Sequence, residues 1–380
     1  MSFRLPADLL DRPTPFYFYD LALLDRTLTA LQQAARPRGF QVHYALKANA
    51  NAPILDLIRQ HGLGADCVSG GEVQRALDAG FAPDHVVFAG VGKSDAEINL
   101  ALAADIWCFN AESVEELTVL NELAGAQNRR TRVALRVNPN VDAYTHPHIT
   151  TGLDANKFGI SLSDLGGVIE QLENLPNLEL VGLHTHVGSQ ITNLTVFEKL
   201  SQKLNELQTW LEDRGHHLPH LNLGGGLGID YHQPDQHSVP DFEQYFRTFE
   251  QHLQRRPNQQ VHVELGRSIV AQCGSLVSRV LYVKHSQQRR FAILDAGMTE
   301  LIRPALYGSY HAIQNLTSQL PAQDYDVVGP ICESSDTFGR QVLLPETRRG
   351  DLLAIRSAGA YGEVMSSGYN LREKAGAEYR

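Results

Sequence analysis

The sequence contains few cysteines and no long apolar run, and both absences exclude classes of protein. Its 380 residues include four cysteines, which lie far apart and form no Cys-x-x-Cys pair. This spacing argues against a disulfide framework and against a zinc site built on cysteine pairs. No stretch approaches the roughly 18 apolar residues of a membrane span. Asp8 and Asp11 interrupt the apolar core that a signal peptide needs. We therefore expect a cytoplasmic protein without a membrane partner.

Basic residues are also scarce. The chain has 33 Lys and Arg residues against 43 Asp and Glu residues, a net charge of −10, and no run of basic residues. A nucleic-acid partner requires a basic surface, so this balance argues against one, although a local basic pocket could still hold a small anion. Hydrophobic residues make up 43% of the chain and charged residues 20%, which is ordinary for a globular protein and excludes a disordered, collagen or coiled-coil chain.

Short apolar runs alternate with segments of helical periodicity through most of the chain. A strand followed by a helix, repeated eight times over roughly 240 residues, is typical of a (β/α)8 barrel. A doubly wound open sheet is the alternative, but most such sheets need fewer units. The eight runs lie at 42–46, 63–68, 85–90, 106–109, 132–137, 180–186, 221–226 and 261–265.

From about Cys273 onward the pattern becomes rich in β-strand residues with turn residues between them, and it has no clear helical period. The strand-like segment 16–20 could join this region. We therefore predict a barrel domain over 21–272, and an all-β domain composed of 1–20 and 273–380.

Polar residues gather at the predicted C-terminal ends of the barrel strands, where such a barrel holds its active site. Lys47 is a candidate amine nucleophile if partly desolvated, although a lone lysine after a strand is more often a surface residue. Glycines 224–226 could direct N–H groups at a phosphate, with Arg267 adding charge. Glu264 needs a partner because an unpaired buried carboxylate is costly, and a protonated ring nitrogen would serve. His186 could stack on a flat ring or be an ordinary core histidine.

Together these residue types suggest a pocket for pyridoxal phosphate. A carboxylate that keeps the ring nitrogen protonated makes this cofactor a strong electron sink, which favours decarboxylation. Two alternatives remain. In a metal-dependent barrel hydrolase, His184 and His186 would bind zinc together with a residue such as Glu264, although that pair would be expected on the first strand rather than the sixth. A barrel could also bind the cofactor without turnover.

Several motifs resemble those of the fold-type III pyridoxal phosphate-dependent decarboxylases, in collinear order from about Pro15 to Asn370. Two further segments, 141–160 and IRPALYGSYH (302–311), resemble the branch of that family that acts on diaminopimelate more than the ornithine or arginine branches. The family motifs are YALKAN (44–49), HTHVGSQ (184–190), LGGGLGID (223–230), ELGRSIV (264–270), GPICESSD (329–336) and GAYGEVMSSGYN (359–370).

The resemblance implies roles for the residues at the barrel mouth. Lys47 would form the Schiff base with pyridoxal phosphate, with Asp66 close to its amine. His186 would stack on the cofactor ring, and Glu264 would pair with the ring nitrogen. The remaining cofactor-binding residues, most of them around the phosphate, would be Ser189, Gly224, Gly225, Gly226, Gly266, Arg267 and Tyr361.

The resemblance also implies a substrate site and a dimer. Cys332 would reach across a subunit interface and donate the proton that quenches the substrate carbanion. Since family members place the active site between two subunits, a homodimer is expected, with the β domain contributing to the interface. The substrate would be bound by Arg267, Arg303, Tyr307, Glu333 and Tyr361.

Diaminopimelate differs from ornithine and lysine in carrying both a carboxylate and an amine at its far end. A cation such as Arg303 and an anion such as Glu333 match these groups. We therefore predict decarboxylation at the D-centre of meso-2,6-diaminopimelate to give L-lysine and CO₂, in lysine biosynthesis. Another diamino acid or a carboxylated polyamine is the alternative substrate. Two departures from the family pattern are Leu265, where a proline is usual, and a chain that stops soon after Asn370. From the second departure we expect an incomplete or rebuilt β domain.

Overall fold

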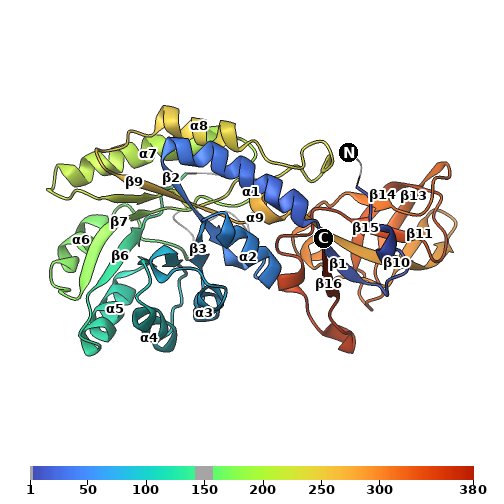
Figure 1. The fold of residues 1–380 in the computed structure, drawn as a ribbon, viewed down its shortest axis with the longest axis horizontal. Helices are drawn as coiled ribbons and strands as arrows, with labels where there is room; N and C mark the ends of the chain where they lie inside the picture. The colour runs from blue at the N-terminus through green and yellow to red at the C-terminus, as the bar shows by residue number, and fades with distance from the viewer. Residues whose placement is uncertain (1–2, 142–156) are drawn as a thin grey trace. The chain divides into compact units, whose positions relative to one another are not determined.

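All eight apolar runs form strands, and these strands close into a parallel barrel (Figure 1). The structure is a computed structural model that describes residues 3–141 and 157–380, so most of the segment 141–160 lies outside the described residues. Pairing of the first barrel strand with the last closes the ring. The barrel strands are β2 (Phe40–Ala45), β3 (Gly64–Cys67), β4 (Val86–Phe88), β5 (Cys108–Ala111), β6 (Thr131–Arg136), β7 (Leu178–His184), β8 (His220–Asn222) and β9 (Gln260–Leu265).

Helices follow the barrel strands, as the prediction of a (β/α)8 barrel requires. Three begin at a serine whose hydroxyl accepts a hydrogen bond from the backbone N–H three residues later, namely Ser69, Ser94 and Ser113. Such caps satisfy a helix N–H group that has no partner within the helix. The helices are α1 (Leu21–Ala35), which precedes β2, then α2 (Ala52–Gln60), α3 (Gly70–Asp78), α4 (Asp95–Ala104), α5 (Val114–Ala126), α6 (Leu165–Leu172), α7 (Thr195–Glu212) and α8 (Phe242–His252).

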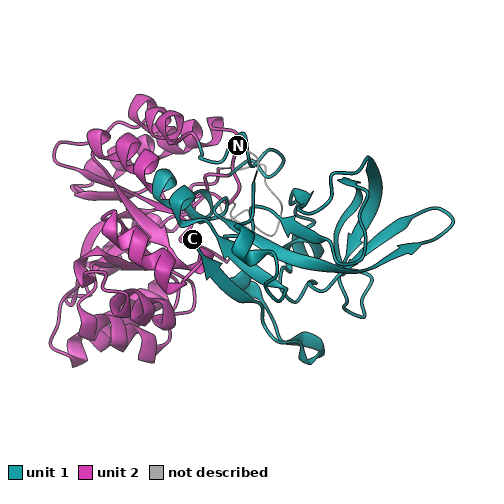
Figure 2. Ribbon diagram, turned by 45° about the vertical axis from the view of Figure 1, so that its right-hand side comes forward, with its two compact units in different colours: residues 1–27, 229–240, 267–380 teal, residues 28–228, 241–266 magenta. Residues whose placement is uncertain are grey.

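The chain forms two compact units (Figure 2). Unit 2 comprises residues 28–228 and 241–266 and contains the barrel. Unit 1 comprises residues 1–27, 229–240 and 267–380. The segment 229–240 therefore leaves the barrel chain after β8 and belongs to the other unit.

Unit 1 is built on a mainly antiparallel sheet with the strand order β12-β15-β10-β11-β13-β14. The predicted N-terminal strand joins it as β1 (Phe16–Tyr19), which pairs antiparallel with β10 and parallel with the last strand of the chain, β16 (Gly376–Tyr379). The other strands are β10 (Gly274–His285), β11 (Arg290–Leu294), β12 (Ile313–Asn315), β13 (Ala322–Val328), β14 (Thr337–Pro345) and β15 (Leu352–Ile355).

Unit 1 is not wholly β. Among its described residues are the short α-helices α9 (Arg267–Val270) and α10 (Arg303–Tyr307). Neither is long enough to show a helical period in the sequence, which is why we expected only strands here. Its apolar core includes Phe16, Phe18 and Val277. Within the described residues, no helix of either unit combines the length and the apolar character that crossing a membrane requires.

The barrel interior holds a chain of three histidines. His43 Nε2 lies 3.0 Å from His262 Nδ1, and His262 Nε2 lies 3.1 Å from His220 Nδ1. His262 is two residues before Glu264 on β9, so both side chains point to the same face of the strand. Trp107 packs against all three imidazoles. Because branched apolar residues normally fill this space, a polar layer here is unusual.

We expect this histidine chain to make the stability of the fold depend on pH. Burial lowers the pKa of His43 to about 4, below its ordinary 6.5, and burial also lowers the pKa of His262 and of His220. The unfolded chain therefore binds a proton at His43 that the folded chain does not. The stabilisation is complete above pH 6.5 and decreases as the pH falls toward 4, by about 3 kcal/mol for His43 alone.

Denaturant unfolding of the wild type and of His43→Gln between pH 7 and pH 4 measures this effect. The variant should lose less free energy of unfolding over that range than the wild type does. His217→Gln, at an exposed histidine, serves as the control. Its free energy of unfolding should depend on pH as that of the wild type does. The prediction would be contradicted if the free energy of unfolding changed equally with pH in the wild type and in His43→Gln.

Candidate active site

Lys47 and Asp66 form an ion pair at the carboxyl end of the barrel. Lys47 lies in a single helical turn (Leu46–Ala48) directly after β2, and Asp66 lies in β3. The distance from Lys47 Nζ to Asp66 Oδ2 is 3.0 Å, and the lysine side chain is 35% exposed whereas the aspartate is fully buried. Burial and the nearby carboxylate of Glu264 raise the pKa of Asp66, and Lys47 opposes that rise. The amine is thus held in place while remaining accessible.

Side chains from three other strands hold the carboxylate of Glu264. Its Oε1 accepts hydrogen bonds from Asn110 Nδ2 at 3.1 Å and from Asn222 Nδ2 at 2.7 Å. Its Oε2 lies 3.0 Å from His184 Nε2. Burial alone would raise the pKa of Glu264, but His184 and Lys47 outweigh it and hold this pKa well below its ordinary value. Glu264 is therefore a buried, ionised carboxylate.

Asn110 and Asn222 are functional residues that were not predicted from the sequence. Each is an amide at the C-terminal end of an apolar strand, in the sequences Cys-Phe-Asn-Ala and Leu-Asn-Leu. The sequence did contain a signal for both residues, namely an amide side chain within an apolar run. Because a buried amide needs hydrogen-bond partners, such a residue predicts a polar contact inside the barrel. Their partner, Glu264, could not be identified from spacing, since it lies 154 residues from Asn110 and 42 from Asn222.

His186 is a half-buried imidazole with a defined hydrogen bond. Its Nδ1 accepts from the backbone N–H of Gly225 at 3.2 Å. Burial, together with the charges of Arg136 and Lys47, lowers the pKa of His186 well below its ordinary value. The ring is therefore neutral, with its proton on Nε2, and such a ring can pack against a flat partner.

The glycine run after β8 is required by close backbone packing. A Cβ at Gly224 would overlap the carbonyl oxygen of Thr185, and one at Gly225 would overlap that of Glu264. The N–H of Gly224 donates to Asn222 Oδ1 at 3.0 Å, and that of Gly225 donates to His186. These two N–H groups therefore donate inside the protein, and the phosphate contact that the sequence predicted for the run stays a prediction.

We expect Gly225→Ala to destabilise the fold by about 1–3 kcal/mol, because the added methyl group must displace the β9 backbone. Thermal unfolding of the purified variant measures this. Gly92→Ala is a matched control, since a Cβ there meets nothing within 4 Å. Equal stability of the two variants would show that the turn is less tightly packed than the structure indicates.

The other predicted cofactor residues in unit 2 are Gly266 and Ser189. A Cβ at Gly266 would lie 3.0 Å from the Cβ of Ala48 and 3.2 Å from that of Ala45, so Gly266 packs against the chain on either side of Lys47. Ser189 is half-buried in the loop after β7.

Unit 1 contains a separate cluster of two buried arginines and several aromatic rings. Arg267 and Arg303 are 6% and 5% exposed. Arg267 Nη1 donates to the hydroxyl of Tyr231 at 2.7 Å, and its guanidinium lies 4.8 Å from the ring centre of Tyr361. The guanidinium of Arg303 lies 5.6 Å and 6.0 Å from the ring centres of Tyr231 and Tyr307. Four predicted residues thus come together, with Tyr231 as an unforeseen member.

Arg303 has no carboxylate within ion-pair distance among the residues that the structure describes. Its Nη2 donates to Ser309 Oγ at 3.1 Å. Burial lowers the pKa of Arg303, and the neighbouring charge of Arg267 adds to this effect. A buried guanidinium remains charged, and an uncompensated buried charge is costly. The cluster is therefore suited to an anionic ligand, above all a carboxylate.

Cys332 and Glu333 lie elsewhere in unit 1, on the loop between β13 and β14. Both are exposed. Glu333 accepts a hydrogen bond from Ser335 at 3.2 Å and lines a pocket of about 380 Å³. Among residues 3–141 and 157–380, no hydrogen bond or ion pair joins either residue to the arginine cluster.

The zinc hypothesis receives no support from His184, the last residue of β7, or from His186 just after it. His184 contacts Glu264, whereas His186 accepts from a backbone N–H. In the ranges 3–141 and 157–380, no group of three His, Cys, Asp or Glu residues is placed to hold a metal ion.

The barrel mouth fits pyridoxal phosphate in its chemistry. An accessible amine, Lys47, can react with the aldehyde. The ionised Glu264 can keep a ring nitrogen protonated, and neutral His186 can pack on the ring. Asp66 Oδ1 is buried and has no hydrogen-bond partner among the described residues, so it can accept from a bound group.

Comparison with known proteins agrees with this chemistry. The family described as pyridoxal-dependent decarboxylase, pyridoxal binding domain, matches residues 21–271. The diaminopimelate decarboxylase of Bacteroides thetaiotaomicron is 57% identical over 361 residues, covering 95% of this chain and 94% of the relative. That of Vibrio cholerae is 43% identical, covering 97% and 88%.

Solved structures give the same result. Diaminopimelate decarboxylase from Helicobacter pylori, complexed with L-lysine, is 40% identical and superimposes with a TM-score of 0.92 over 97% of this chain and 92% of that one. The enzyme from M. jannaschii, also in complex with L-lysine, is 33% identical with a TM-score of 0.89 over 97% and 87%. This chain therefore belongs to the pyridoxal-dependent decarboxylases and, within them, to the diaminopimelate decarboxylase family.

Proposed function

We propose that this protein decarboxylates meso-2,6-diaminopimelate at its D-centre, giving L-lysine and CO₂ in lysine biosynthesis. The observation that carries the proposal is the buried Arg303, which has no carboxylate partner among the described residues. Diaminopimelate has a second carboxylate at its far end, whereas ornithine and lysine do not. The relatives named diaminopimelate decarboxylase, two of them solved with L-lysine, support the same substrate.

Pyridoxal phosphate would be held by residues at the barrel mouth. Lys47 would bind it covalently, and Glu264 and His186 would contact its ring. When bound, this cofactor supplies an electron sink for the electron pair left on the substrate α-carbon as CO₂ leaves. Asn110, Asn222 and His184 keep Glu264 ionised through their hydrogen bonds. Other residues that would contact the cofactor are Asp66, Ser189, Gly224, Gly225, Gly226, Gly266, Arg267 and Tyr361.

The far carboxylate of the substrate would be bound by Arg303, together with Arg267 and the tyrosines 307 and 361. Guanidinium groups bind carboxylates through two parallel hydrogen bonds, so they also orient the substrate. Glu333 would bind the far ammonium group, and Cys332 would donate a proton to the α-carbon after CO₂ has left. Because both lie on an exposed loop, we propose that they act on the active site of the partner subunit in a cytoplasmic homodimer.

Release of CO₂ from meso-diaminopimelate by the cofactor-loaded protein tests the proposed activity. LL-diaminopimelate, which has no D-centre, and ornithine, arginine and lysine are the parallel substrates. Saturable release from the meso isomer alone is expected. Release only from another diamino acid or a carboxylated polyamine would overturn the substrate, and no release from any would overturn the reaction.

Mixing two inactive variants tests the shared site. We expect Lys47→Ala and Cys332→Ala subunits to regain activity when they are combined under conditions that exchange subunits, because one site of the mixed dimer then has both residues intact. Each variant refolded alone is the control. If the mixture stays as inactive as its components, Cys332 does not act across an interface.

A further inference from the structure

In unit 1, the segment 229–240 packs against the residues that follow α10 through two adjacent pairs of aromatic rings. The rings of Tyr231 and His311 meet edge to face, with centres 5.1 Å apart at 75°. The rings of His232 and Tyr310 stack, with centres 4.2 Å apart at 15°. Each pair joins a Tyr-His dipeptide of one segment to a Tyr-His dipeptide of the other. Only the first pair touches the arginine cluster.

Each member of the first pair accepts a hydrogen bond from one arginine. The Tyr231 hydroxyl accepts from Arg267 Nη1 at 2.7 Å, and His311 Nε2 accepts from Arg303 Nε at 3.4 Å. The other ring nitrogen, His311 Nδ1, lies 2.9 Å from the carbonyl oxygen of Arg356. A carbonyl oxygen can only accept, so Nδ1 carries the proton and Nε2 is left as an acceptor. Burial and the charge of Arg303 lower the pKa of His311 to about 3, which keeps the ring neutral.

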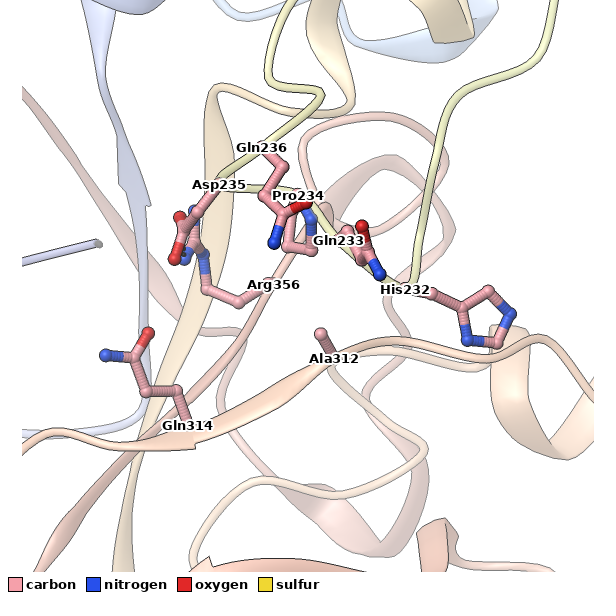
Figure 3. Close-up of a pocket in the computed structure, with 8 residues that line it drawn as sticks. All are labelled: His232, Gln233, Pro234, Asp235, Gln236, Ala312, Gln314 and Arg356. Carbon is pink, nitrogen blue, oxygen red and sulfur yellow. Dashed lines mark hydrogen bonds and ion pairs between the residues drawn. The ribbon is translucent and has the colours of Figure 1, made fainter. Parts of the chain in front are cut away.

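Arg356, which orients His311, is itself fixed. Its Nη1 forms an ion pair with Asp235 Oδ1 at 2.9 Å, and its Nε donates to Ser275 Oγ at 3.1 Å. Figure 3 shows the Asp235 and Arg356 side chains facing each other beside a pocket of about 240 Å³. Asp235 belongs to the same segment as Tyr231, so this segment is tied to the cluster through Tyr231 and to Arg356 through Asp235.

The two acceptors, His311 and Tyr231, are both uncharged, and this determines how much of the arginines' positive charge is left for a ligand. A carboxylate beside Arg303 would hold the guanidinium in place but would also neutralise it, leaving little attraction for a substrate carboxylate. A neutral imidazole aims the guanidinium and leaves its charge available. The phenol of Tyr231 is likewise an uncharged acceptor.

We propose that His311 and Tyr231 are positioning residues that aim Arg303 and Arg267 without neutralising them, and that they thereby select substrates with a carboxylate at the far end. This inference rests on the proposed function, which assigns that carboxylate to the arginine cluster. Neither residue contacts the reacting α-carbon in this proposal, so both should act on substrate affinity more than on turnover.

Three variants at position 311 and one at position 231 test the proposal. His311→Gln keeps a neutral acceptor and donor, His311→Glu adds a neutralising charge, and His311→Leu removes the acceptor. For the Glu and Leu variants we expect the KM for meso-diaminopimelate to rise about tenfold or more, with a smaller change in kcat, and the Gln variant should stay close to wild type. Tyr231→Phe should raise KM, whereas Tyr310→Phe, in the ring pair that touches neither arginine, should not.

Calorimetric binding of pimelate gives a readout that does not depend on the reaction, because this probe has two carboxylates and no amine. The His311→Glu variant should bind it about tenfold more weakly than the Gln variant does. Equal affinities and equal KM values for Gln and Glu, with both variants folded by thermal unfolding, would overturn the proposal. A wild type that binds pimelate but releases no CO₂ would instead overturn the proposed function and leave the positioning role standing.

Discussion

Replacing Lys47 by alanine is expected to lower kcat for CO₂ release from meso-diaminopimelate by at least about 10³-fold, because the covalent link to the cofactor and a positioned amine are lost together. Lys93, another lysine close to the strand ends, cannot take over. Its amine is buried and donates to Gly90 O, Asn110 O and Glu116 Oε1, which uses all three of its donors.

Lys47→Arg distinguishes the loss of the reactive amine from the loss of the ion pair with Asp66. This variant keeps a positive charge beside Asp66 but has no amine that can react with an aldehyde. We expect it to be as inactive as Lys47→Ala, while its thermal unfolding stays closer to that of the wild type. Activity is followed by CO₂ release, and cofactor retention by absorbance after dialysis. More than a tenth of wild-type activity in either variant would exclude Lys47 as the nucleophile.

Arg303→Met is expected to give the second largest loss. Removing one partner of a buried charge pair costs about 2–5 kcal/mol, which corresponds to a decrease in kcat/KM of at least about 30-fold. The decrease should come mainly from KM, because the guanidinium binds the far carboxylate in substrate and transition state alike. Steady-state kinetics with meso-diaminopimelate measure it.

Two further variants define the origin of this loss. Arg303→Lys keeps the charge but not the planar fork, so it should recover only part of the affinity. Arg214→Met, at an exposed arginine of α7's C-terminal flank, should leave both kinetic constants unchanged. An unaltered KM in Arg303→Met would mean that the far carboxylate is bound elsewhere. The buried charge of Arg303 would then no longer support diaminopimelate as the substrate.

Local sequence patterns were sufficient to predict the barrel. Each of the eight apolar runs overlaps a barrel strand. This signal depends on residues that are neighbours in the chain, since a buried parallel strand is apolar throughout. The placement of Lys47 and Glu264 at strand ends follows from the same runs.

The partners of these residues were decided by the tertiary structure alone. Asn110 and Asn222 reach Glu264 from other strands, and the glycine N–H groups are used by Asn222 and His186. No local pattern encodes such contacts, because they depend on which side chains the closed barrel brings face to face.

In the arginine cluster, too, some features were predictable from the sequence and others were determined only by the tertiary structure. The sequence by itself determined that the chain carries Arg267 and Arg303 in family motifs, and that its strands alternate with helices to form a barrel. Only the tertiary structure decided that the segment 229–240 joins unit 1 and that Tyr231 and His311 accept from the two arginines. The reason is physical: strand and helix periods arise from neighbouring residues, whereas a buried charge is oriented by whatever polar groups distant parts of the chain place beside it.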